Sequence, residues 1–324
     1  MSHVFAPMAK PLQMRRMRGI SLVELMISIA IGLVLMLAIT SIYVSSAGAG
    51  RVAEAQGRMN EDAQAALTIL SQQLRMAGNN PLQPNYASTT PRNPVYDTTT
   101  YIVRGCDGTF TNISSAANPA ALTCTAGVNT SPDSIAIHYE ADQYNTVPTT
   151  GGVATDCLGQ SLPALTTTLN VWDGAASVPT VVTYRVADNR FYIGTSGVIT
   201  QPSLYCKGNG NATPQPLVEN IEDLQLTYGT STAASAAMAV AGYLTANSVE
   251  TQTDLAALAN SKLRWDKVMT VRVCVLARSE VPVVTDSVSA RYVKCDGTLE
   301  NNPPDLRLRK AYTTTVVLRN RVTP

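Results

Sequence analysis

One long apolar segment near the N-terminus constrains this 324-residue chain more than any other feature. Residues 20–44 read ISLVELMISIAIGLVLMLAITSIYV and carry a single charge, Glu24. At about 1.5 Å of rise per residue, a helix of this length crosses a hydrocarbon core of about 30 Å. Three arginines stand at positions 15, 16 and 18, so the positive-inside rule directs the chain after residue 45 away from the cytoplasm.

Two ordinary interpretations of this segment leave Glu24 unexplained. A secretory signal predicts a shorter apolar stretch followed by a small-x-small cleavage site, which residues 45–47 could mimic. A plain signal anchor fits the length better. Neither accounts for the acid, because an intramembrane carboxylate costs about 3 kcal/mol unless it has a partner, and such residues are functional by default.

The residues at the start of the segment resemble the class III leader of type IV prepilins and pseudopilins. Residues 18–25 read RGISLVEL. In that family a prepilin peptidase cuts after the glycine and methylates the new N-terminal amine. The resemblance implies that Gly19 is the last leader residue and that Ile20, where the family more often has Phe, is the first mature, methylated residue. Glu24 then falls at the fifth mature position, where the family keeps its acid.

The position of this acid has a physical reason. Cleavage would leave an ammonium group at Ile20 in a low-dielectric setting, and Glu24 of a neighbouring subunit could neutralise it. The leader of 19 residues is long for the family. A start at Met14 would give the more typical six-residue leader MRRMRG.

The apolar pattern continues beyond residue 44 in steps of three and four, the spacing of one helix face. The positions that share this face are Val52, Ala55, Met59, Ala63, Ala66, Leu70, Leu74 and Ala77. Gly78 and Pro81 then mark a helix stop. We therefore expect one helix from Ile20 to Ala77, roughly 87 Å long, with an inner half that packs in a filament and an outer half that packs on its own domain.

The sequence after residue 79 predicts a β-rich domain, because short β-branched runs are separated by Pro, Gly and Asn. Strands are expected at residues 101–104, 134–140, 181–186, 190–193, 268–276, 289–295 and 312–320. Residues 217–228 are expected to begin as a helical turn and end as a strand, with Leu224, Leu226 and Tyr228 on one face. Helical character is expected at residues 253–262.

The predicted fold class is α+β and pilin-like. A long N-terminal helix, transmembrane first and amphipathic afterwards, would pack on a disulfide-bearing antiparallel β-sheet domain. We expect a prepilin leader at residues 1–19, the helix at residues 20–78 with its transmembrane part at residues 20–44, and an extracytoplasmic globular domain at residues 79–324.

Six cysteines follow the apolar segment, and none belongs to a Cys-x-x-Cys pair. An even number on one side of a membrane segment indicates disulfides in an oxidising compartment. Sequential bridges are the simplest arrangement: Cys106–Cys124, Cys157–Cys206 and Cys274–Cys295. Six cysteines allow fifteen connectivities, so the spacing alone leaves the pairing open.

The C-terminal part resembles the PilW-type minor pilins, which are larger relatives of the J-type minor pseudopilin of type II secretion. The positions that carry this resemblance are Leu217, Asn220, Ile221, Glu222, Leu224 and Tyr228, then Trp265, Val268, Val271, Arg272, Val273, Arg278 and Ser279, and finally Thr314, Thr315, Val316, Leu318, Arg319 and Asn320. The resemblance implies a minor pilin that joins a priming complex at or near the tip of a type IV pilus.

The same resemblance implies a set of partners and a location. The partners would be other minor pilins, the major pilin, prepilin peptidase, the inner-membrane assembly platform and a tip adhesin. The protein would cross the inner membrane once, hold its C-terminal domain in the periplasm and later enter the pilus, in a system serving twitching motility or cell adhesion. Two alternatives stay open: a minor pseudopilin of a type II secretion system, and an uncleaved, signal-anchored binding protein or enzyme.

No pattern for catalysis or for a cofactor stands out, so we expect a protein that is not an enzyme and needs no cofactor or metal. His138 has acidic neighbours but no nucleophile elbow or second base. Asp296, Glu300 and Asp305 lack the spacing of a known calcium loop. A net charge of +1 argues against direct nucleic-acid binding. A short basic cluster near the C-terminus, formed by Arg307, Arg309, Lys310, Arg319 and Arg321, is more typical of protected edge strands.

Overall fold

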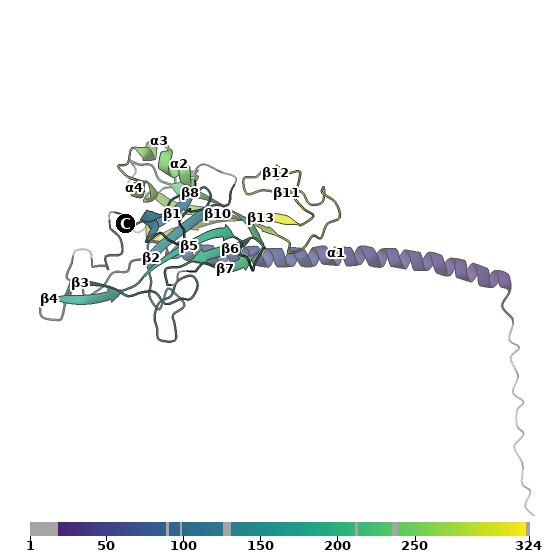
Figure 1. Ribbon diagram of the computed structural model, residues 1–324, viewed down its shortest axis with the longest axis horizontal. Helices are drawn as coiled ribbons and strands as arrows, with labels where there is room; N and C mark the ends of the chain where they lie inside the picture. Colours follow the sequence, from purple (N-terminus) through teal and green to yellow (C-terminus); the bar gives the residue numbers. More distant parts are fainter. Residues whose placement is uncertain are drawn as a thin grey trace, which may run out of the picture. The chain divides into compact units, whose positions relative to one another are not determined.

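The computed structural model describes residues 19–88, 91–97, 99–125, 131–210, 213–234 and 239–321 (Figure 1). The chain divides into two compact units, Met1–Arg51 and Val52–Pro324. Helix α1, Leu22–Met76, begins in the first unit and ends in the second. The arginines of the predicted leader lie outside the described residues.

The second unit contains two main antiparallel sheets. The first has the order β1-β2-β5-β6-β7, and the second has the order β13-β10-β8-β9. The strands of the first sheet are β1 (Val103–Cys106), β2 (Ser134–Glu140), β5 (Val186–Gly194), β6 (Ser203–Lys207) and β7 (Gln215–Glu219). Those of the second are β8 (Ile221–Thr230), β9 (Gly242–Leu244), β10 (Val268–Arg278) and β13 (Arg309–Val317).

Two hairpins and several short helices complete this unit. The hairpins are β3 (Leu165–Trp172) with β4 (Ser177–Tyr184), and β11 (Tyr292–Val293) with β12 (Leu299–Glu300). The helices are α2 (Ala246–Thr251), α3 (Thr253–Ala256), α4 (Ser261–Trp265), η1 (Pro119–Ala121) and η2 (Arg319–Arg321). Helices α2, α3 and α4 gather beside β8 (Figure 1). The α+β class with a helix on antiparallel sheets is therefore confirmed.

The outer part of α1 supplies one wall of the main core. Its buried residues are Met59, Ala63, Ala66, Leu70 and Leu74, which lie on the face that the three- and four-residue spacing predicts. They pack in one core with side chains from both sheets, among them Tyr139, Phe191 and Tyr228. Burying each large apolar side chain contributes roughly 1.5–3 kcal/mol. This helix is therefore an integral part of the globular unit.

Asn320, near the C-terminal end of the chain, caps the C-terminal end of α1. Gly78, at a φ of 78°, takes the left-handed conformation that commonly ends a helix. The Nδ2 of Asn320 donates to the carbonyls of Arg75, Met76 and Ala77 at 3.2, 3.3 and 3.1 Å. These carbonyls belong to the last turn, where no further helical donor is available.

Three disulfides join Cys106 to Cys124, Cys157 to Cys206, and Cys274 to Cys295. These are the pairs of the sequential arrangement. They close loops of 18, 49 and 21 residues, for which the chain-entropy account gives about 3, 4 and 3 kcal/mol.

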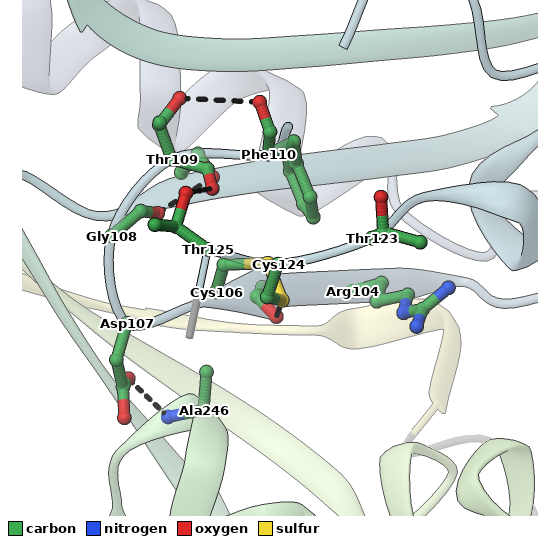
Figure 2. Close-up of a disulfide and its surroundings, with 12 residues drawn as sticks. Arg104, Cys106, Asp107, Gly108, Thr109, Phe110, Thr123, Cys124, Thr125 and Ala246 are labelled. Atoms are coloured by element: carbon green, nitrogen blue, oxygen red, sulfur yellow. Dashed lines mark hydrogen bonds between the residues drawn. A yellow bond between two sulfur atoms is a disulfide. The ribbon is translucent and has the colours of Figure 1, made fainter. Parts of the chain in front are cut away.

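The Cys106–Cys124 bridge fixes a turn that reaches the small helices (Figure 2). Next to it, Gly108 has a φ of 105°, and the Thr125 hydroxyl donates to the Thr109 carbonyl at 2.9 Å. The Asp107 carboxylate accepts from the backbone N–H of Ala246 at 2.7 Å, at the start of α2 (Figure 2). Asp107, next to the disulfide, thereby ties the end of β1 to the start of α2.

Several predicted element boundaries are wrong. Residues 217–228 contain no helical turn, because β7 and β8 flank Asn220, whose φ of 61° turns the chain between two strands. The strand expected at residues 181–186 is split between β4 and β5. The last strand ends at Val317 rather than at residue 320, since Asn320 leaves the sheet to meet the end of α1. Only Tyr292 and Val293 of the expected strand 289–295 pair as a strand.

Candidate assembly site

The described part of the first unit is an apolar helical surface. Its most apolar 18-residue window has a mean hydropathy of 2.7, and none of that window is buried. Large apolar side chains are exposed along this part of the helix, with exposed fractions of 74% at Leu22 and 68% at Met36. A surface of this kind needs a lipid or protein environment. The length and composition of α1 allow it to cross a membrane, but a secretory signal can have the same length and composition. The residues at the start of the helix therefore decide between a membrane anchor and a secretory signal.

Two hydroxyl groups on this helix bond back to its own backbone. Ser28 Oγ donates to the Glu24 carbonyl, and Thr40 Oγ1 donates to the Met36 carbonyl, each at 2.7 Å. Such bonds hide the hydroxyl hydrogen from an apolar environment. These two polar groups are therefore compatible with a position in the membrane.

Glu24 lies in the first turn of α1, four residues after Ile20, which precedes the helix. The backbone N–H of Leu25 donates to the Ser21 carbonyl at 3.0 Å, so regular helix starts at this point. A carboxylate is favoured here because the helix macrodipole is positive at its N-terminal end. Glu24 is exposed and belongs to none of the ion pairs recorded in the described ranges. The site therefore presents an exposed carboxylate four residues after the residue that would carry the new amine.

Hydrogen bonds fix the outer half of α1 on the sheets. Gln73 Oε1 accepts from the Tyr139 hydroxyl at 3.2 Å and from Asn189 Nδ2 at 2.7 Å. Tyr139 and Asn189 are buried, and burial raises the pKa of Tyr139 to about 12. A buried hydrogen-bond donor without an acceptor lowers the stability of the folded state. Gln73 therefore sets the rotation of the helix against β2 and β5.

Two further contacts reach α1 from the second sheet and from the turn before it. The Tyr312 hydroxyl of β13 donates to Asn60 Oδ1. Asn220 Nδ2 donates to Asp62 Oδ2 at 3.4 Å, and burial together with nearby Glu61 and Glu219 raises the pKa of Asp62. None of these partners was predicted from the sequence, because polar residues off an apolar stripe give no signal of what they bind.

His138 is held as a structural residue of β2. It is buried, burial lowers its pKa, and it packs edge-on against Tyr96 with ring centroids 5.8 Å apart. Its cross-strand neighbour Asp188 is committed to Arg190, with an Nη2–Oδ2 distance of 2.6 Å. No nucleophile–base pair forms around this histidine among the residues described.

The acidic and basic residues near the C-terminus pair with each other. Arg309 donates to Glu222 and to Asp305, the latter at 2.7 Å, and Arg307 donates to Asp305 at 2.8 Å. Although burial alone would raise the pKa of Asp305, these hydrogen bonds hold it well below its usual range. Within the described ranges no group of three or more His, Cys, Asp or Glu residues could hold a metal ion. This basic cluster is thus partly neutralised inside the protein.

Two segments of the chain match known families. Residues 14–40 match the prokaryotic N-terminal methylation motif. Residues 190–320, which run from β5 to η2, match the type IV pilus-assembly protein W family. Comparisons with curated proteins and with solved structures give no match.

Leader motif, apolar anchor and helix-on-sheet fold together define a type IV pilin-like protein. Within that class, the match of residues 190–320 to the type IV pilus-assembly protein W family supports a PilW-type minor pilin. The pilus-assembly family implies other pilins and an assembly machinery as partners. Pilin families are structural rather than enzymatic, and the methylation motif with the apolar helix indicates membrane anchoring.

Proposed function

We propose that this protein joins a minor-pilin complex that primes pilus assembly and sits at or near the pilus tip. Prepilin peptidase would first cleave after Gly19 and methylate the amine of Ile20. The observation that carries the proposal is the open Glu24 carboxylate at the start of an apolar helix with no buried residue in its most apolar window. Such a helix is completed only by other subunits or by lipid.

Glu24 would pair with the N-terminal amine of a neighbouring subunit. A carboxylate in the membrane is unfavourable by about 3 kcal/mol. An opposite charge 4 Å away contributes about 4 kcal/mol at an effective dielectric constant of 20. The two magnitudes are similar, so pairing offsets the penalty, and a subunit without its acid would enter the assembly less readily.

The proposed location follows from the charges and the disulfides. The three leader arginines would stay in the cytoplasm, so the globular unit would lie in the periplasm. Three disulfides within that unit suit an oxidising compartment. The protein would wait there as a single-pass inner-membrane protein until the assembly platform, the major pilin and other minor pilins recruit it. A tip adhesin would then be held by the globular unit.

A mutation in the anchor tests this mechanism. In a piliated host, Glu24→Ala should leave leader cleavage intact but deplete the protein from sheared pili and reduce twitching. Glu61→Ala is the matched control, because Glu61 is an exposed acid further along the same helix and should leave both unchanged. Normal incorporation and piliation with Glu24→Ala would contradict the charge-pairing mechanism.

The match to pilus-assembly protein W favours a pilus over a type II secretion system. A pseudopilin role predicts that deletion of the gene blocks protein secretion while pili still form. Counting pili and assaying secreted protein in the same deletion strain separates the two functions. The pilus role predicts fewer pili with normal secretion.

A further inference from the structure

A cavity of about 900 Å³ opens beside the end of α1, in a part of the globular unit that the proposed assembly role does not use. Its wall combines the loop after α1, residues 86–102 as far as they are described, and β3 at residues 168–170, with single residues from α4 and η2. This volume lies within the range of small-ligand sites, roughly 300–1,000 Å³.

The wall of this cavity is polar and almost without negative charge. Five asparagines line it: Asn79, Asn80, Asn93, Asn170 and Asn320. None of its described lining residues is an aspartate or a glutamate. Of the two cations, Lys262 is paired with Asp266 at 2.5 Å, whereas Arg92 is exposed and donates one guanidinium N–H to the Asn80 carbonyl. Amides both donate and accept hydrogen bonds, so the wall suits a neutral ligand that does the same.

Two of these amides are already oriented by the protein. Asn79 Nδ2 donates to the Glu140 carbonyl at 3.0 Å, and Asn320 Nδ2 donates to the end of α1. The structure records no donor to the Oδ1 atom of either residue within its described ranges. Both oxygens are therefore acceptors on side chains whose conformational entropy is already lost, which lowers the cost of binding.

The same wall also provides donors and rigid aromatic rings. Asn170 and Thr168 are exposed on β3, and their side chains make no recorded hydrogen bond within the described part of the chain. The hydroxyl of Tyr86 donates to Asn93 at 2.8 Å, and that of Tyr96 donates to the His138 carbonyl at 2.9 Å. Because both hydroxyls are engaged, both rings are held in place.

We propose that this cavity binds a carbohydrate, namely a neutral or N-acetylated segment of two or three sugar rings. Sugar hydroxyls would donate to the amide oxygens of Asn79 and Asn320 and accept from Asn170 and Arg92. The C–H face of a ring would pack on a tyrosine. A metal ion is disfavoured by the lack of carboxylates in the described lining, and a purely apolar ligand would leave the amides unpaired.

Binding is measured with the full-length protein in a sugar-free zwitterionic detergent, by saturation-transfer NMR. The probes are N,N′-diacetylchitobiose, cellobiose and maltose, each titrated separately. We expect saturable binding of at least one probe after the signal from protein-free micelles is subtracted. If none of the three binds saturably, the proposal is wrong.

A pair of double variants then locates the site. Thr168→Ala with Asn170→Ala removes two side chains from the wall and should weaken binding about tenfold, the effect of losing two ordinary hydrogen bonds. Thr183→Ala with Asn301→Ala makes the same chemical changes at exposed positions that do not line the cavity, and should leave binding unchanged. Equal affinities for the two double variants would overturn the assignment. Neither measurement depends on entry into a pilus.

Discussion

Replacing Gln73 with alanine tests how α1 is fixed on the sheets. The change removes the acceptor of the Tyr139 hydroxyl and of Asn189 Nδ2, two groups whose residues are 1% and 0% exposed. Asn189 keeps a 3.3 Å contact to the Tyr139 oxygen, so the tyrosine O–H loses its partner fully and the amide loses its shorter bond. One unpaired buried donor costs about 1–3 kcal/mol.

The expected loss in the free energy of unfolding is therefore about 2–3 kcal/mol. For a globular unit of this size it corresponds to a fall in Tm of roughly 4–12 °C. The assay is thermal unfolding of the full chain in detergent micelles, followed by near-ultraviolet circular dichroism. Gln72→Ala is the matched control, because Gln72 is the exposed neighbour on the same helix. If both variants melt at the same temperature, Gln73 does not fix the helix as described.

Three further predictions concern the globular unit. Exchanging both Cys274 and Cys295 for serine should lower its unfolding free energy by about 3 kcal/mol, measured by denaturant titration; an unchanged midpoint would count against the chain-entropy reasoning. Burial raises the pKa of Asp133 to about 8, so its proton is held in the folded state and stability falls as pH rises from about 4 to 8. Asp133→Asn should flatten that decline in a Tm-versus-pH series, and parallel curves for variant and wild type would refute it. A Cβ at Gly105 would overlap the Tyr228 hydroxyl, so Gly105→Ala should destabilise by about 1–3 kcal/mol, whereas Gly242→Ala, which meets open space, should not.

The anchor and the general architecture were predictable because each has a local pattern. A long apolar run, a three- and four-residue stripe and alternating β-branched segments are readable without knowledge of tertiary contacts. The stripe from Met59 to Leu74 faces the core as expected, and β2 has the predicted bounds, Ser134–Glu140. Leu224, Leu226 and Tyr228 are buried, in agreement with their shared face.

The features that were not predicted depend on contacts between residues that lie far apart in the sequence. Strand β3 was missed, and β4 was expected only from residue 181, because the strands of this Thr-rich hairpin pair mainly with each other. The turn at Asn220 was missed because an asparagine with a positive φ between two strands looks like a helical start in sequence. The roles of Gln73 and Asn320 are set by partners 66 to 245 residues away. No local pattern encodes such separations.

Whether the chain is processed as a prepilin is decided by the N-terminus of the mature protein. Protein purified from the membranes of a host with an active prepilin peptidase is digested, and its N-terminal peptide is sequenced by mass spectrometry. We expect a chain that begins at N-methylated Ile20, in wild type and in Glu24→Ala alike. A mature protein that keeps the arginines at positions 15, 16 and 18 would show an uncleaved signal anchor and would contradict the assignment as a working pilin.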